Sequence, residues 1–502
     1  MLNNSAEIYI NNNYMSNEIS KLTPNEVWEN FYAITRIPRP SNHEEQIRQF
    51  IADFGKNLGL ETIQDKTGNV IIRKPASAGL EKHKGVILQG HLDMVPQKNS
   101  DKDHDFTKDP IETVIDGEWV RANGTTLGAD NGIGVAAAMA VLASKDLVHG
   151  PIEALFTATE ETGMDGAVGL KSGLLKGDIL INLDSEDEGE LYVGCAGGED
   201  ANVLFNYTEV QVPSESIAFR LNVTGLKGGH SGLDIFLGRG NANKIFFRIL
   251  KEAHKVCGLR LASINGGNLR NAIPREAFGI VTVPYEKADK LVGLLAGLTT
   301  VIKRELSATE PTLKIELSKT EMPAMLIDEQ TQSNLTHAIV ACPNGVIRMS
   351  DSMPGLVETS TNLAIVKSDS DAKTISIAVL MRSSVDTARA ELGSRMDSVF
   401  SLAGAKVSLA GGYPGWKPNM ESPILKTMQQ VYQSNFGRIP EIKAIHAGLE
   451  CGILGGTYPS WDMISFGPTI RFPHSPDEKV NIESVSKFWD FLVETLKSIP
   501  VK

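Results

Sequence analysis

Residues 84–93 read KGVILQGHLD, and this stretch decides the fold that the sequence predicts. The apolar part, 85–89, is typical of a short buried strand, and His91 and Asp93 follow where that strand ends. Similar apolar runs alternate with helical patterns, which predicts an α/β fold with a mixed, largely parallel sheet and flanking helices. Such sheets place their sites at the carboxyl ends of strands. We therefore expect a site at the end of this strand.

Acidic and imidazole side chains follow the other predicted strands and turns in the same way. After His91, they are Asp130, Glu160, Glu161, Asp184 and His474. Carboxylate and imidazole groups together are typical ligands of divalent metals with zinc-like preferences. Taken singly, each residue also suits an ordinary turn, helix cap or solvated acidic surface. The metal hypothesis depends on their order and on their shared position at strand ends.

Two divalent metals ~3.5 Å apart need one bridging carboxylate, and each metal then needs one histidine and one further carboxylate. The five ligands would leave a position for a bridging water. Asp93 is placed to orient the ring of His91 through the nitrogen that does not bind metal. Glu160 and Glu161 are adjacent and their side chains diverge, so Glu160 is free to act as general base.

Composition excludes several classes of protein. The chain has 502 residues and a net charge of −12, which argues against non-specific nucleic-acid binding. No apolar run reaches the ~20 residues of a membrane-spanning helix, and no secretory signal is evident, so we expect a cytoplasmic protein without membrane contact. The four cysteines are scattered, which predicts reduced, buried thiols and not a disulfide framework or a zinc–thiolate site.

A chain of this length predicts more than one domain. The change of pattern along the sequence predicts a loose Asn-rich extension, a catalytic domain in two parts and an α+β domain inserted into it. The ranges are 1–20 for the extension, 21–200 and 411–502 for the catalytic domain, and 201–410 for the insertion.

Three local predictions bear on the site and its surroundings. Ser41 and Glu44 have the spacing of a capping box for the helix that follows them. The charged segment 98–108, which contains His104, is predicted to be a solvated loop and not a source of ligands. Residues 481–499 are predicted to form an amphipathic helix that closes the chain.

Five stretches of the sequence resemble the metal-site motifs of a di-zinc peptidase family that includes carnosinases, aminoacylases and desuccinylases. They are Gly90–Asp93, Leu127–Gly132, Thr159–Gly163, Asn182–Asp184 and Pro473–Ser475. The resemblance extends over about residues 22–500 and shows no departure at a metal or catalytic position. It implies two divalent metal ions per subunit, with zinc expected and cobalt or manganese acceptable.

The resemblance also implies a role for each residue. Asp130 would bridge the two metals, with Asp93 as the orienting acid and Glu160 as the base. One metal would take His91 and Asp184, and the other Glu161 and His474. In the inserted lid domain, His230 would stabilise the oxyanion, and Asn271 and Arg382 would bind the substrate. His446, in the second part of the catalytic domain, is also expected to bind substrate.

The function implied is hydrolysis of dipeptides with free termini, of broad specificity that includes Xaa-His substrates, by a homodimer formed through the lid. The first alternative is an amidohydrolase of the same family that cleaves N-acyl amino acids. The second is a metal-dependent binding protein without activity, which would not need Glu160.

Overall fold

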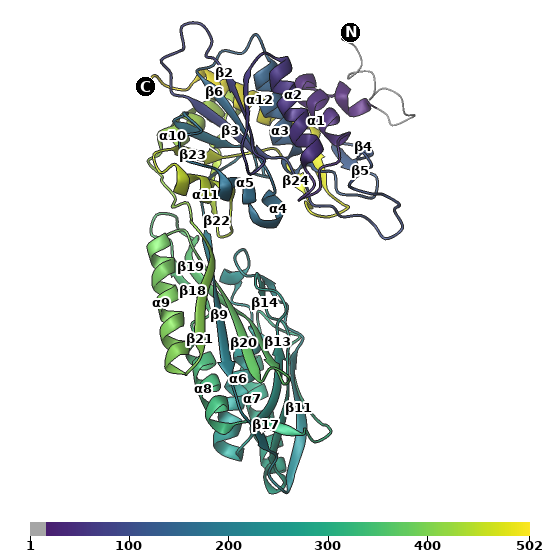
Figure 1. Cartoon of the computed structure of the whole chain (residues 1–502), viewed down its shortest axis with the longest axis vertical. Helices are drawn as coiled ribbons and strands as arrows, with labels where there is room; N and C mark the ends of the chain where they lie inside the picture. The colour runs from purple at the N-terminus through teal and green to yellow at the C-terminus, as the bar shows by residue number, and fades with distance from the viewer. Residues whose placement is uncertain (1–16) are drawn as a thin grey trace. The chain divides into compact units, whose positions relative to one another are not determined.

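The computed structural model describes residues 17–502, and most of the predicted extension 1–20 lies outside them. Residues 18–21 form a short 3-10 helix in which Ile19 is buried. The chain divides into two compact units (Figure 1). Unit 1 comprises the chain up to Val193, Asn419–Lys443 and Ile453–Lys502, and unit 2 comprises Gly194–Pro418 and Ala444–Gly452. The predicted insertion, 201–410, lies within unit 2.

Unit 1 is built on an eight-stranded sheet of order β1-β2-β6-β3-β7-β23-β8-β22. The neighbours β6, β3, β7 and β23 run parallel, whereas β1, β2 and β8 pair antiparallel with their neighbours, so the mixed α/β fold is confirmed. The strand bounds are β1 Glu61–Gln64, β2 Val70–Lys74, β3 Val86–His91, β6 Ile152–Thr157, β7 Ile179–Asn182, β8 Glu190–Cys195, β22 Glu441–Ile445 and β23 Asp462–Ser465.

Helices cover this sheet, and a small sheet of β4, β5, β24 and β25 lies beside it (Figure 1). The helices are α1 Asn25–Thr35, α2 Glu45–Asn57, α3 Ala129–Ala143, α4 Glu160–Gly163, α5 Asp165–Gly169, α10 Pro423–Phe436, α11 Glu450–Thr457 and α12 Ile482–Lys497. The small sheet comprises β4 Thr113–Asp116, β5 Trp119–Ala122, β24 Ile470–Arg471 and β25 Lys479–Asn481. Helix α12 buries Phe488 and Leu492, which confirms the predicted closing helix.

Unit 2 is an antiparallel sheet of order β16-β11-β15-β13-β19-β20-β9-β21, with β18 paired to β19. Helices α6, α8 and α9 pack on the sheet around one apolar core, and α7 packs on α6. The principal elements are β9 Gly197–Asn206, β11 Ser216–Thr224, α6 Ala242–Cys257, β13 Arg260–Gly266, β15 Ala277–Pro284, α7 Ala288–Glu305, β16 Lys314–Lys319, α8 Glu329–Ala341, β18 Gly345–Met349, β19 Val357–Asp369, β20 Thr374–Ser383, α9 Asp386–Leu402 and β21 Lys406–Tyr413. The short pairs are β10 Glu209–Gln211 with β17 Met325–Ile327, and β12 Gly229–His230 with β14 Ala272–Ile273.

Three further predictions can be compared with the structure. All four cysteines are free and buried, as expected. No helix within residues 17–502 is long and apolar enough to cross a membrane. The prediction of a wholly solvated loop at 98–108 is wrong for His104, which is buried with its ring edge-on to Phe106. The contact with the Phe106 ring buries His104, and the charge pattern of the segment does not predict this contact.

Candidate metal centre

The predicted ligands converge at one edge of the sheet in unit 1. His91 is the last residue of β3, the pair Glu160–Glu161 begins α4 just after β6, and Asp184 lies two residues beyond β7. Since these strands are parallel neighbours, their carboxyl ends meet at the same edge. Asp130, in the first turn of α3, reaches the same place. Residues that are far apart in the sequence therefore form one cluster in space.

Asp130 lies between the two histidines. Its Oδ1 is 3.0 Å from Nε2 of His91, and its Oδ2 is 3.2 Å from Nε2 of His474. Each carboxylate oxygen thus faces a different imidazole, which is the arrangement that a bridging ligand requires. His474 comes from the turn after β24 and has positive φ, 60°.

A further carboxylate accompanies each histidine. Nε2 of His91 is 3.3 Å from Oδ1 of Asp184, and Nε2 of His474 is 3.0 Å from Oε2 of Glu161. Two possible ligand groups result, His91–Asp130–Asp184 and Asp130–Glu161–His474, with Asp130 common to both. A third grouping contains His91, Glu160 and Glu161.

The cluster has the character of a site built for cations. Oε1 of Glu161 is buried without a hydrogen-bond partner in the described chain, and Oδ1 of Asp184, also buried, faces only Nε2 of His91 at 3.3 Å. Burial raises the pKa of Asp184 to about 7, and the carboxylates of Asp130 and Glu161 act in the same direction. Hydrogen bonds to Asp130 and Glu161 raise the pKa of His474 to about 11. Two divalent cations would fit this donor set and neutralise its excess negative charge.

Asp93 is fully buried behind His91. Nδ1 of His91 lies 3.2 Å from the carbonyl oxygen of Asp93 and 3.3 Å from its Oδ1. Both neighbours are acceptors, so they favour the proton on Nδ1 and leave Nε2 for a metal. The Asp93 carboxylate also accepts the backbone N–H groups of Glu160 and Glu161, at 2.9 and 3.2 Å. One side chain therefore orients a ligand and fixes the backbone of the acidic pair.

The predicted capping box is wrong. Helix α2 begins at Glu45, and no described side chain caps it. Instead, Ser41 donates its hydroxyl to Oδ2 of Asp93 at 2.8 Å, and Glu44 accepts the Thr159 hydroxyl at 2.9 Å. The spacing of the two residues fits a capping box, but buried acceptors and donors beside the candidate ligands compete successfully for their side chains.

Two buried charged residues at this edge escape sequence reasoning. Arg39 and Glu478 bind the backbone of segments that carry ligands. The signals that could have drawn notice are the position of Arg39 between two prolines and that of Glu478 four residues after His474.

The three residues predicted to act from the lid, His230, Asn271 and Arg382, lie in unit 2. His446, predicted in the catalytic part 411–502, also falls in unit 2, within Ala444–Gly452. Ser231, next to His230, donates its backbone N–H to the carbonyl of Asn271 at 2.8 Å. The hydroxyl of Ser231 accepts from Nε of Arg382 at 3.4 Å. His446 is 2.7 Å from the hydroxyl of Ser360, which lies opposite Arg382 in the β19–β20 register.

Arg382 is buried, and its guanidinium has no acidic partner among residues 17–502. Nε contacts Ser231, and Nη1 donates to the hydroxyl of Tyr413 at 3.2 Å. The nearby positive charge and burial lower the pKa of His446 to about 3, with burial the larger cause, and act in the same direction on His230. A buried cation normally has a counter-ion, so this arrangement suits an anionic ligand.

His230 is held in one tautomer. Its Nδ1 accepts the backbone N–H groups of Gly232 and Leu233, at 3.1 and 3.0 Å. An Nδ1 that accepts two bonds carries no proton, so the proton of the neutral ring is on Nε2. The ring is therefore a neutral hydrogen-bond donor.

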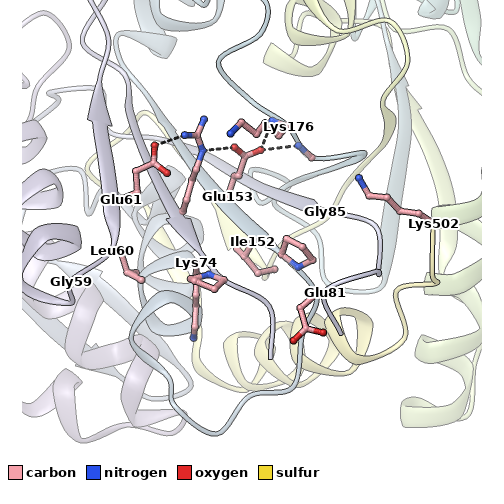
Figure 2. Close-up of a pocket in the computed structure, with 14 residues that line it drawn as sticks. Gly59, Leu60, Glu61, Lys74, Glu81, Gly85, Ile152, Glu153, Lys176 and Lys502 are labelled. Carbon is pink, nitrogen blue, oxygen red and sulfur yellow. Dashed lines mark hydrogen bonds and ion pairs between the residues drawn. The ribbon is translucent and has the colours of Figure 1, made fainter. Parts of the chain in front are cut away.

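A cavity of about 430 Å³ lies at the opposite edge of the unit 1 sheet (Figure 2). Its lining includes Gly85 and Ile152, at the amino ends of β3 and β6, together with Arg73 and Glu153. None of the residues predicted for the site lines it, and among its charged groups Arg73 is paired with Glu61 and Glu153.

Comparison with known proteins gives a consistent set of similarities. The sequence model of peptidase family M20/M25/M40 matches residues 87–498. The cytosol non-specific dipeptidase of Escherichia coli is 49% identical over 485 residues, which cover 97% of this chain and 100% of that protein. The crystal structure of aminoacylhistidine dipeptidase from Vibrio alginolyticus is similar with a TM-score of 0.91 and 50% identity, over 96% of this chain and 98% of that one. Aminopeptidase PepT from Bacillus cereus shares the fold, with a TM-score of 0.56 and 15% identity over 95% and 99% of the two chains.

Proposed function

This chain belongs to peptidase family M20/M25/M40, and from that premise we propose that it is a metal-dependent dipeptidase of broad specificity, with Xaa-His peptides among its substrates. The observation that carries the proposal is the position of Asp130 between His91 and His474, in a chain half identical to a dipeptidase over its full length.

We propose that one metal is held by His91 and Asp184, the other by Glu161 and His474, and both by Asp130. The donor set suits zinc best and also accepts manganese or cobalt. When bound, the two cations supply Lewis acidity that polarises the scissile carbonyl and lowers the pKa of the attacking water.

Glu160 is the proposed general base. Its carboxylate has an oxygen within 4.8 Å of ligand atoms of His91 and Glu161, and its backbone is fixed by Asp93. It would take a proton from the attacking water and deliver it to the leaving nitrogen. Glu161 is the ligand and Glu160 the base in this assignment, because Glu161 is the residue in contact with His474.

Arg382 supports the preference for a free carboxyl terminus. Two of its three guanidinium nitrogens are bound by Ser231 and Tyr413, which leaves Nη2 without a partner in the described chain. A buried guanidinium of this kind binds a carboxylate strongly and rejects a neutral amide. We further propose that His230, as a neutral Nε2 donor, stabilises the oxyanion, and that Asn271 and His446 complete the binding of substrate.

The E. coli relative is named as a cytosol dipeptidase, which supports a cytoplasmic location for this protein. Assembly into a homodimer through unit 2 stays a prediction, which sedimentation of the purified protein would test.

The test is removal and return of the metal. We would strip the purified protein with a chelator, add Zn²⁺, Mn²⁺ or Co²⁺, and follow cleavage of Ala-His, β-Ala-His, Ala-His amide and N-acetyl-methionine. Restored cleavage of the free dipeptides, with little activity on the amide, is expected. Cleavage of N-acetyl-methionine alone would assign the protein to the deacylases, and full metal occupancy without any hydrolysis would favour a binding protein.

A further inference from the structure

Three of the proposed metal ligands come from segments far apart in the sequence, with Asp130 and His474 separated by 344 residues. We propose that Arg39 and Glu478 are positioning residues that fix the spacing of His91, Asp130 and His474 and so set the affinity for the metal pair. This inference extends the proposed metal site, and metal binding tests it without any measurement of peptide hydrolysis.

Glu478 joins the segment of His474 to that of Asp130. Its side chain is buried, with 2% exposure, and its carboxylate accepts four consecutive backbone N–H groups. Oε2 accepts from Leu127 at 2.8 Å and Gly128 at 2.9 Å, and Oε1 accepts from Ala129 at 2.7 Å and Asp130 at 3.2 Å. Because Glu478 lies four residues after His474, its carboxylate ties the segment that carries His474 to the segment that carries Asp130.

The N–H groups of Ala129 and Asp130 are the first of α3, and those of Leu127 and Gly128 directly precede it; N–H groups at a helix start have no partner within the helix. The cap residue, Gly128, has no side chain that could bind them. A carboxylate at a helix amino terminus is also favoured by the helix dipole. Glu478 therefore acts as a cap from a distant part of the chain, and the direction in which α3 begins, hence the position of Asp130, depends on it.

Arg39 joins the same loop to the end of β3. It is also 2% exposed, and its Nη1 donates to the carbonyl groups of Leu92 and Asp93, at 2.9 and 2.8 Å. Its Nη2 donates to the carbonyl of Gly128. Burial lowers the pKa of Arg39, and the carboxylate of Glu478 is the strongest of the charges that oppose this, so the two groups lie close enough to stabilise each other.

The backbone at Gly128 packs tightly against the Arg39 guanidinium. Its φ is +71°, and a Cβ there would lie 2.5 Å from Nη2 of Arg39 and 2.9 Å from the sulfur of Met94. The loop can approach the guanidinium only because this residue is glycine. The approach brings Asp130 into contact with His91, which the end of β3 carries.

Glu478→Gln is the direct test. The amide replaces one acceptor oxygen with a donor, so two of the four N–H groups lose their partner and face an NH₂ group. We expect the dissociation constant for Zn²⁺, measured by competition with a chromophoric chelator, to rise ~10–100-fold, as is usual for residues that orient metal ligands. Metal content after dialysis should fall below two ions per chain.

Glu153→Gln is the matched control (Figure 2). Glu153 is buried in the same unit and accepts the backbone N–H groups of Lys176 and Gly177 at 2.7 and 2.8 Å, together with Nε of Arg73 at 2.9 Å. It lies at the opposite edge of the sheet. Both variants should lower the Tm of the metal-free protein, but only Glu478→Gln should weaken metal binding.

Wild-type zinc affinity in folded Glu478→Gln would overturn the proposal, as would an equal loss of affinity in both variants. If Glu478→Gln does not fold, Arg39→Lys takes its place, because an ammonium keeps the charge but loses the fork that binds three carbonyl groups. The same rise in the dissociation constant is expected there, and unchanged affinity would refute the positioning role. If the metal affinities are as expected but the wild-type protein does not hydrolyse dipeptides, the proposed function is wrong and the positioning role of Arg39 and Glu478 stands.

Discussion

Asp93→Asn tests whether the Asp93 carboxylate holds the candidate metal ligands in place. Four groups face this carboxylate. Oδ1 accepts the N–H of Glu160 and faces the His91 ring, and Oδ2 accepts the N–H of Glu161 and the hydroxyl of Ser41. Burial raises the pKa of Asp93, but the hydrogen bond and charge of His91 outweigh it and lower the pKa to about 2. At neutral pH all four partners therefore meet an anion.

An asparagine offers one acceptor oxygen in place of two. With the NH₂ group at the Oδ1 position, the Glu160 N–H and the His91 ring lose their acceptor; at the Oδ2 position, the Glu161 N–H loses its acceptor, while the Ser41 hydroxyl can turn to accept from the amide. A hydrogen bond to a charged group contributes about 1.5–3 kcal/mol, so losing one or two of them costs about 1.5–6 kcal/mol. If the transition state bears this whole cost, kcat/KM decreases by ~10–10⁴-fold.

The assay is hydrolysis of Ala-His at saturating Zn²⁺, with metal content measured on the same sample. Ser41→Ala is the control, because it removes one of the four partners and leaves the carboxylate, and we expect a loss of about tenfold at most. Wild-type kcat/KM and metal content in Asp93→Asn would refute the reasoning, since the geometry leaves no neutral substitute for the second oxygen.

Four other outcomes are expected. Glu160→Gln should lower kcat by ~10²–10⁴-fold with unchanged metal content by elemental analysis; loss of metal would show that Glu160 is a ligand. Arg382→Lys should raise KM for Ala-His ~10–100-fold and remove the preference over Ala-His amide, and a KM within twofold of wild type would contradict carboxylate binding. His446 has a pKa lowered to about 3 in the folded protein, so it is neutral there but titrates near 6.5 when unfolded. Its contribution to stability is complete above pH 6.5 and falls by up to ~1.4 kcal/mol per pH unit as pH decreases towards 3, and urea titrations of His446→Gln should lack this slope. Chelation should lower Tm, and Zn²⁺ at 100 times its dissociation constant should restore about 2.7 kcal/mol of the free energy of unfolding for each site that it occupies; a Tm insensitive to chelator would argue against a metal at this site.

The positions of the candidate ligands were open to prediction because each follows a short apolar run or lies in a glycine-flanked turn. The end of a strand can be recognised locally, and a parallel sheet then brings several such ends together. In the structure His91 contacts Asp130 and Asp184, and a carboxylate oxygen of Glu161 lies within 4.8 Å of ligand atoms of Asp130 and of His91.

Other parts of the site were beyond prediction because they depend on contacts between distant segments. The approach of Glu478 to Leu127–Asp130 leaves no periodic pattern in the sequence. For Ser41 and Glu44 a local pattern exists but misleads. Their spacing fits a helix cap, whereas Ser41 donates to Asp93 and Glu44 accepts from Thr159. A local motif cannot report which distant acceptor will compete for it.

The division of unit 1 into separate stretches of chain has a consequence for biosynthesis. Unit 2 is almost continuous, so its sheet can assemble while the chain is still being made. The proposed metal centre, by contrast, includes His474, and both His474 and Glu478 come from the last stretch of unit 1. A ribosome that stalls before this point leaves a carboxylate-rich half-site with one histidine in place of two. With His474 as a ligand, as proposed, we expect metal loading to be completed among the last events in the maturation of this protein.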